Sequence, residues 1–225
     1  MKHKILFAGI DGSGKSTCLD LLISRLDSYY SIIKIDIFGH YRFFKGEKRS
    51  VFNHRYYKIM ENLRTISKKH NLYGAFLIIN FIYKLVLTKI IEILNKCDLL
   101  MYSTDLFLHP AVYVTYYFPF TRKVKASFRF YIFNILFWSK RNFTIIYLDT
   151  NPEVAMERIR KRGTGIDAHE KIGVLKKLKQ EFDNIIGIAS RNGFEVISIK
   201  TDDKNLEEVT DEIQAILGEK ISIGQ

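Results

Sequence analysis

Nine consecutive residues near the start of the chain have the types and the spacing that hold polyphosphate. They read Gly-Ile-Asp-Gly-Ser-Gly-Lys-Ser-Thr over positions 9–17 and fit the pattern G-x-x-x-x-G-K-[ST]. Glycines let the backbone curl so that successive N–H groups point at phosphate oxygens. An apolar run precedes the pattern and an amphipathic segment follows it, as such a loop requires. The predicted phosphate-binding residues are Gly9, Asp11, Gly12, Ser13, Gly14, Lys15, Ser16 and Thr17.

Two side chains of this loop define the expected ligands. Lys15 can reach the β- and γ-phosphates, and the hydroxyl of Ser16 can bind Mg²⁺. The pattern therefore predicts ATP, or a close relative, together with Mg²⁺. A GTPase switch would need a base-reading N-K-x-D motif after a strand, and none follows a strand here. Phosphoryl transfer to a small acceptor is the chemistry that remains.

A second set of candidates is a run of arginines that ends at a helix breaker. Arg158, Arg160 and Arg162 lie within about one and a half helical turns, and residues 163–165 read Gly-Thr-Gly. Guanidinium groups on a flap can close over phosphates and neutralise developing charge. We therefore predict catalytic roles for Arg158 and Arg162. The alternative is a solvated basic end of a helix.

Asp105 is the carboxylate that could complete the site. It follows an apolar segment at 98–103 and would lie at the carboxyl end of a strand, where doubly wound sheets bind ligands. There it could organise the waters of Mg²⁺ or accept the proton of the acceptor. Asp105 is therefore a predicted catalytic, substrate-binding and metal-binding residue. Capping the next helix is the alternative.

The elements that must position these residues alternate between strand and helix. This pattern predicts a three-layer α/β fold, with a five-stranded parallel sheet covered on both faces. We expect a single domain over 1–225, with a core at about 1–38 and 98–218, a helical insertion at about 50–97 and 120–140, and an arginine-rich lid at about 160–170. The predicted strands are 4–10, 31–38, 98–103, 143–149 and 194–200, and the predicted helices are 16–26, 152–162, 169–192 and 205–217.

Charge and cysteines bound the setting. The formal net charge of +11 favours anionic ligands, although much of it can equally be a solvated surface. Cys18 and Cys97 lack metal-ligand spacing and suit buried positions in a reducing cytosol. The apolar run at the N-terminus is too short for a signal peptide, so a cytoplasmic location is predicted. We see no nucleic-acid-binding module, so nucleic acid is not an expected partner.

Two apolar stretches in the middle of the chain predict an interface. Residues 72–96 and 128–138 read as core helices or as helices through which a homodimer forms. Lys84, Lys89 and Glu92 argue against a membrane span. Peripheral contact with lipid is the alternative, because Arg122, Lys123 and Lys125 adjoin the second stretch.

The chain resembles thymidylate kinase and its nucleoside-monophosphate-kinase relatives. The resemblance rests on the loop at 9–17, on the strand, Asn-Pro-Glu turn and arginine-rich helix at 146–163, and on the C-terminal order of long helix, strand, Thr-Asp turn and final helix. It covers residues 1–38 and 143–218. It implies a P-loop kinase fold and phosphorylation of dTMP to dTDP by ATP, with Arg158 near the adenine and Arg162 near the phosphates.

The acceptor side departs from this family. Ala8 stands where the family has Glu, and Leu106 replaces the Arg of its Asp-Arg-Tyr segment at Asp105. After the second strand the chain reads Phe-Gly-His-Tyr-Arg, so Arg42 is a candidate clamp for an acceptor phosphate, and Asp11 for a sugar hydroxyl. Three hypotheses stay open: a nucleoside-monophosphate kinase, a kinase of the same fold that acts on a sugar, glycan precursor or lipid, and a non-catalytic nucleotide-binding protein.

Overall fold

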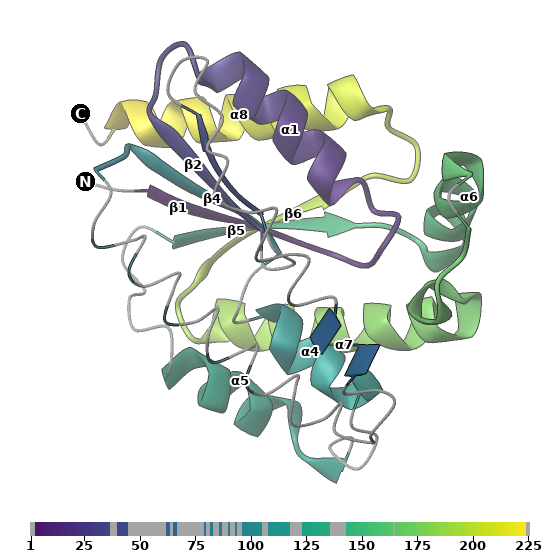
Figure 1. Ribbon diagram of the computed structural model, residues 1–225. Coiled ribbons are helices and arrows are strands. Elements are labelled where there is room, and N and C mark those ends of the chain that lie inside the picture. The colour runs from purple at the N-terminus through teal and green to yellow at the C-terminus, as the bar shows by residue number, and fades with distance from the viewer. Residues whose placement is uncertain are drawn as a thin grey trace.

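A computed structural model of the chain describes residues 3–36, 40–44, 62–63, 65–66, 79, 82, 86, 90, 93, 96–104, 108–117, 123–135, 143–163 and 165–223. These residues form a sheet with helices on both faces, the three-layer arrangement that the sequence predicts (Figure 1).

Six strands form the sheet, in the order β3-β2-β4-β1-β5-β6. The central strand β1 pairs in parallel with β4 on one side and with β5 on the other. β2 and β6 extend the parallel set, so the predicted five-stranded parallel sheet is confirmed. The strands are β1 (His3–Ala8), β2 (Ile32–Asp36), β3 (His40–Phe44), β4 (Leu99–Thr104), β5 (Phe143–Asp149) and β6 (Glu195–Lys200).

The edge strand β3 was not predicted. It pairs antiparallel with β2, with Lys34 opposite Arg42. Three of its five residues are aromatic, as strands favour, and His40 and Arg42 belong to the segment in which the sequence departs from thymidylate kinases. Arg42, the candidate clamp for an acceptor phosphate, therefore lies on an edge strand.

Helices cover the two faces of the sheet. α1 and α8 lie on one face, and α4, α5 and α7 lie on the other (Figure 1). Alternation along β1 serves both layers, because Ile5 and Phe7 pack with α1 and α8 while Leu6 and Ala8 pack with the opposite layer. The helices are α1 (Lys15–Leu26), α4 (Leu108–Tyr117), α5 (Ala126–Ile135), α6 (Pro152–Arg162), α7 (Ile172–Arg191) and α8 (Leu206–Ile223).

The predicted helix at 169–192 is divided in two. A single 3₁₀ turn, η2 (Ala168–Glu170), precedes α7, and Lys171 between them is extended, with φ −65° and ψ 139°. The helical pattern of the sequence is continuous through this point. Contacts of His169 and Glu170 with the site, described below, explain why the chain turns here.

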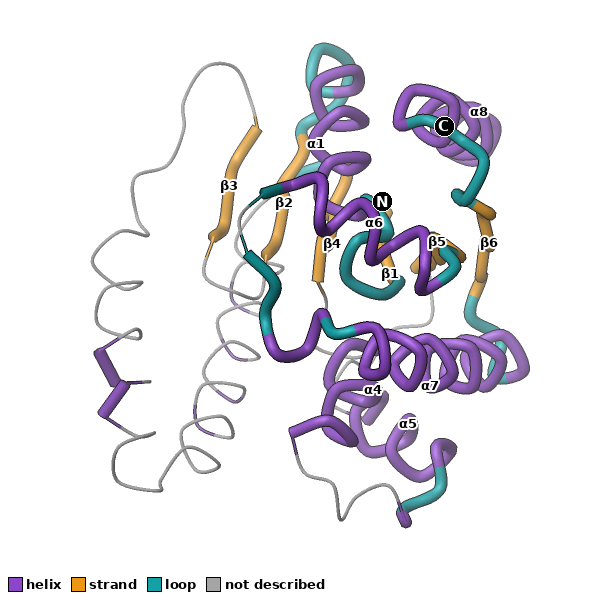
Figure 2. The backbone as a smooth tube through the Cα atoms, turned by 90° about the vertical axis from the view of Figure 1, so that its right-hand side faces the viewer, coloured by secondary structure: helices purple, strands orange, loops and turns teal. Residues whose placement is uncertain are grey.

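The carboxyl ends of the five parallel strands share one edge of the sheet. The predicted site residues that the structure describes lie in segments that leave the strands at this edge. Residues 9–14 leave β1 at this edge, and α6 begins directly after β5. Figure 2 looks onto the edge and shows α6 lying across the sheet in front of β1 and β5. Asn151 caps α6 by accepting a hydrogen bond from the N–H of Glu153 (2.9 Å), and Pro152 occupies its first turn.

The string N-K-x-D does occur in the chain, at 95–98, but its Asp98 lies at the opposite edge of the sheet. Asp98 precedes β4, and its carboxylate accepts hydrogen bonds from the N–H (2.8 Å) and the hydroxyl (2.6 Å) of Ser31. It therefore joins the start of β4 to the start of β2 and is remote from the loop at 9–14.

Most of the predicted insertion at 50–97 and part of that at 120–140 lie outside the described residues. Among the residues that the structure does describe, none of the helices combines the length and the apolar character that crossing a bilayer requires.

Candidate active site

The loop between β1 and α1 has the backbone that the glycines predict. Gly9, Gly12 and Gly14 have positive φ values of 145°, 82° and 89°. Main-chain bonds close the loop, from the N–H of Ser13 to the carbonyl of Ile10 (3.2 Å) and from that of Cys18 to the carbonyl of Gly14 (2.9 Å). The first turn of α1 holds no acidic residue, so the positive end of the helix faces the loop unopposed.

Gly12 makes the closest approach between this loop and another element. A Cβ atom at Gly12 would lie 2.4 Å from the carbonyl oxygen of Ala155 and 3.0 Å from Cγ1 of Ile159, both in α6. Real Cβ atoms do not come so near to backbone oxygen. The loop therefore packs directly against the helix that carries the arginines, and only glycine fits there.

Lys15 lies inside the curl of the loop. Its side chain is buried, and Nζ donates hydrogen bonds to the carbonyl oxygens of Gly9 (2.8 Å) and Ile10 (2.7 Å). Burial lowers the pKa of this ammonium group, and the nearby charge of Asp11 acts in the opposite direction. An entering phosphate would supply stronger, charged acceptors for the same group.

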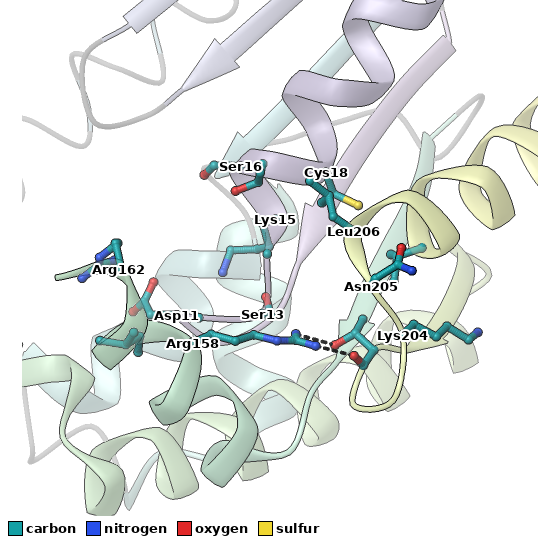
Figure 3. Close-up of a pocket in the computed structure, with 16 residues that line it drawn as sticks. Asp11, Ser13, Lys15, Ser16, Cys18, Arg158, Arg162, Lys204, Asn205 and Leu206 are labelled. Carbon is teal, nitrogen blue, oxygen red and sulfur yellow. Dashed lines mark hydrogen bonds between the residues drawn. The ribbon is translucent and has the colours of Figure 1, made fainter. Parts of the chain in front are cut away.

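A cavity of about 640 Å³ opens above the loop. Its walls are the loop and the start of α1, the inner side of α6, and the segment from Thr201 to Val209 that leads into α8 (Figure 3). Ser16 and Thr17, at the start of α1, and the arginines 158 and 162 also line it. The cavity thus brings together most of the side chains that the sequence predicts for phosphate binding.

Arg158 is fixed at the α8 side of the cavity. Its Nη1 donates to the hydroxyl of Thr201 (3.1 Å) and its Nη2 to the carbonyl of Thr201 (2.5 Å), as the dashed lines in Figure 3 show. Thr201 is itself bonded to Thr150 (2.7 Å) at the end of β5. The guanidinium group is therefore held in the wall of the cavity beside the segment that leads into α8.

Arg162 is the last residue of α6 and lies on the side of Asp11 (Figure 3). Its Nη2 donates to both carboxylate oxygens of Glu170, at 2.8 and 3.0 Å. Gly163 ends the helix in the left-handed conformation, with φ 72°. The structure thus places the two predicted lid arginines at different ends of one cavity.

Asp11 has partners that the sequence analysis missed. The hydroxyl of Tyr113 in α4 donates to its carboxylate (2.6 Å), and Nε2 of His169 in η2 lies 3.7 Å from the same oxygen. The sequence could have indicated Tyr113, because it lies in the segment that follows the predicted strand at 98–103. The position of His169 depends on the break before α7, which the sequence pattern does not show. Asp11 therefore joins the phosphate loop to the opposite helical layer.

Two predicted residues cannot be placed. Asp105 lies outside the described residues, and Arg42 is described only through its backbone in β3. No group of three or more His, Cys, Asp and Glu side chains with the spacing of a metal site occurs among the residues that the structure describes. The described metal candidate is Ser16, which is exposed at the cavity.

Comparison with known proteins supports the fold. The chain matches no protein-family model and no curated protein. Among solved structures it is similar to deoxyadenosine kinase from M. mycoides with bound dATP, at 18% identity and a TM-score of 0.56, over 96% of this chain and 99% of that one. The same kinase with bound dCTP gives 18% identity and 0.55 over the same shares. With the products dCMP and a flexible dCDP it gives 16% identity and 0.53, over 96% and 98%. The chain therefore has the fold of a P-loop nucleoside kinase.

Replacing Gly12 by alanine should lower the free energy of unfolding by more than about 2 kcal/mol, because the new Cβ would overlap the main chain of α6. Gly193→Ala is the matched control. Gly193 has a similar φ of 80° but open space around it, so only left-handed strain of about 1 kcal/mol is expected there. Urea unfolding followed by circular dichroism measures both variants. Equal losses would contradict the tight packing of Gly12.

Proposed function

We propose that this protein transfers the γ-phosphoryl group of ATP to a nucleoside or a nucleoside monophosphate. The observation that carries the proposal is the cavity itself, in which the phosphate loop and Lys15 face two arginines of one helix. Main-chain N–H groups, one lysine and guanidinium groups are the parts that stabilise a transferring phosphoryl group. A nucleotide-binding protein without activity would not need the second arginine.

The described contacts support the donor side of this proposal. Lys15 would leave the carbonyls of Gly9 and Ile10 to bind the β- and γ-phosphates. Arg162 lies on the loop side, where the γ-phosphate would be, and Arg158 lies on the α8 side, where the adenine would stack on its guanidinium plane. Mg²⁺ commonly keeps several waters and binds one or two protein groups plus phosphates, which an exposed Ser16 hydroxyl fits.

The acceptor side is proposed from sequence position. Asp105 would accept the proton of the acceptor hydroxyl or orient a water on Mg²⁺, and Arg42 would bind an acceptor phosphate. Asp11, held by Tyr113 at the edge of the cavity, would contact the sugar. The likeness to deoxyadenosine kinase favours a deoxynucleoside, and the likeness to thymidylate kinases favours dTMP. A sugar or lipid alcohol is the remaining alternative.

We also propose that the protein acts as a homodimer. Ile79, Ile82, Val86, Ile90 and Ile93 are helical, recur at spacings of three and four, and are 44–78% exposed. Residues at spacings of three and four lie on one side of a helix, and we refer to these five side chains as the apolar stripe. Phe128, Tyr131 and Ile132 add exposed apolar side chains on α5. Monomeric proteins rarely expose such surfaces, so we infer that a second copy of the chain covers these side chains.

A cytoplasmic location of the protein stays a prediction.

An acceptor screen tests the proposed activity. With ATP and Mg²⁺, we expect phosphorylation of deoxyadenosine, deoxycytidine, thymidine or dTMP, detected by coupled ADP release and by mass spectrometry of the product. Lys15→Ala should lower turnover about 100-fold or more, because a charged group at the phosphates is lost. Lys176→Ala, which removes an exposed lysine paired with Glu153, is the control that should keep full activity. Product only from sugars or lipid alcohols would exclude a nucleoside kinase.

The dimer is tested by charge insertion. The wild-type protein should sediment at twice the chain mass of 26.4 kDa, and Ile82→Glu should give monomers, because two buried carboxylates would face each other. Tyr29→Glu is the control, because Tyr29 is also exposed but lies between α1 and β2. Sedimentation equilibrium measures all three proteins. A monomeric wild-type protein would refute the dimer and leave lipid contact as the explanation of the stripe.

A further inference from the structure

The short turn η2 contacts the site at two points. Its two polar side chains, His169 and Glu170, go to different elements. Glu170 forms the two-oxygen ion pair with Arg162 at the end of α6, and His169 lies 3.7 Å from Asp11 in the phosphate loop. The ring of Tyr116 in α4 packs edge-on against His169, with the centroids 6.4 Å apart. This turn of three residues thus contacts α6, the phosphate loop and α4.

The burial of Glu170 makes its pair with Arg162 different from the surface ion pairs of α6. Glu170 is 3% exposed, and the N–H of Asp167 donates to Oε2 of its carboxylate (2.9 Å). A buried carboxylate is costly unless it is paired, so Arg162 is held where Glu170 requires it. By contrast, Lys161 and Glu157 pair one turn apart with both side chains exposed, and such pairs hold little.

The end of α6 needs an anchor if Arg162 is to act at a defined point. Arg162 is the last residue of the helix, and Gly163 and Gly165 follow it with positive φ values. An arginine at such an end carries several rotatable bonds, and ordering it during the reaction would reduce the gain from its charge. Glu170 lies eight residues further along the chain. Its carboxylate restrains the guanidinium group of Arg162, which also lines the cavity.

We propose that Glu170 is a positioning residue for phosphoryl transfer, which fixes Arg162 at the cavity, and that the contact of His169 with Asp11 ties the turn that carries it to the phosphate loop. The proposal rests on the proposed kinase function. It assigns Glu170 no contact with substrate, because its carboxylate is enclosed by Arg162 and the N–H of Asp167. Its effect on catalysis therefore passes through Arg162.

The kinetic test is a double-mutant cycle. Glu170→Gln keeps the size of the side chain but removes its charge. It should lower kcat about tenfold and change KM for ATP less than about twofold, the pattern of an interaction that matters in the transition state. In the Arg162→Ala background, Glu170→Gln should lower kcat no further. Glu153→Gln is the control, because Glu153 lies on α6, as Arg162 does, and pairs with exposed Lys176. The kcat of Glu153→Gln should equal that of the wild-type protein.

Two kinetic outcomes would overturn the proposal. One is a kcat for Glu170→Gln within about twofold of the wild-type value. The other is an equal drop from Glu170→Gln with and without Arg162, because Glu170 would then act by another route. A general loss of structure is recognised by thermal unfolding of each variant. It cannot imitate the cycle, since it would lower activity in both backgrounds.

A second readout works without turnover. Trypsin cleaves after arginine, so the rate of cleavage between Arg162 and Gly163, followed by mass spectrometry, reports how firmly Arg162 is held. Glu170→Gln should raise this rate severalfold, whereas Glu153→Gln should not. An unchanged rate in Glu170→Gln would overturn the anchoring of Arg162 even if the protein phosphorylates nucleosides. If no acceptor is phosphorylated, the proposed function fails, and the cleavage rate alone decides whether Glu170 holds Arg162.

Discussion

The contact of Gly12 with α6 is the constraint on which the site depends. A phosphate loop binds through main-chain N–H groups, so its shape must be held by its surroundings. Here the backbone at Gly12 rests on Ala155, and the backbone at Gly9 comes so near to Leu148 of β5 that a Cβ there would lie 2.8 Å from its carbonyl oxygen. The register of β1 with β5, Ala8 opposite Tyr147, brings these segments together. One strand pair thus fixes both the loop and the start of the helix that carries Arg158 and Arg162, so backbone packing sets how the phosphate loop lies relative to that helix.

Polar contacts complete this frame at the carboxyl edge of β5. The hydroxyl of Tyr147 donates to Asp183 of α7 (2.7 Å), and burial, with the charge of Asp183, raises the pKa of that hydroxyl. Lys179 bridges Asp183 (2.6 Å) and Asp149 (3.0 Å). Buried polar groups need such partners, and a satisfied network favours one arrangement of the elements it joins. The network anchors α7 to β5 behind α6. Because η2 leads directly into α7, the position of Glu170 relative to α6 follows from the same contacts.

The sequence predicted what depends on local pattern. The loop at 9–17 is recognisable because its glycine, lysine and serine residues must occur at fixed spacing. The bounds of α6 are recognisable because Asn-Pro precedes its first turn and Gly163 follows its last residue. It did not predict what depends on partners. The helical periodicity at 169–192 continues through Lys171, so the pattern did not predict the break that places Glu170 beside Arg162. The bond between Tyr113 and Asp11 joins residues 102 positions apart. The sequence analysis also missed β3, although the aromatic character of Tyr41, Phe43 and Phe44 favours a strand.

The same distinction explains why the donor side is readable and the acceptor side is not. Every triphosphate presents the same oxygens and the same metal, so the chemistry that grips it dictates residue types at fixed spacing. An acceptor is recognised by whichever side chains reach its particular hydroxyls and ring, and these come from elements with no common pattern. Under the proposed function, α4 and the edge strand β3 would supply them, since both lie at the points where the sequence leaves the thymidylate-kinase pattern. Asp11 belongs to both sides, since it is part of the phosphate loop and yet is bonded to α4. Through the bond between Tyr113 and Asp11, a change in α4 that suited a different acceptor would also act on the phosphate loop.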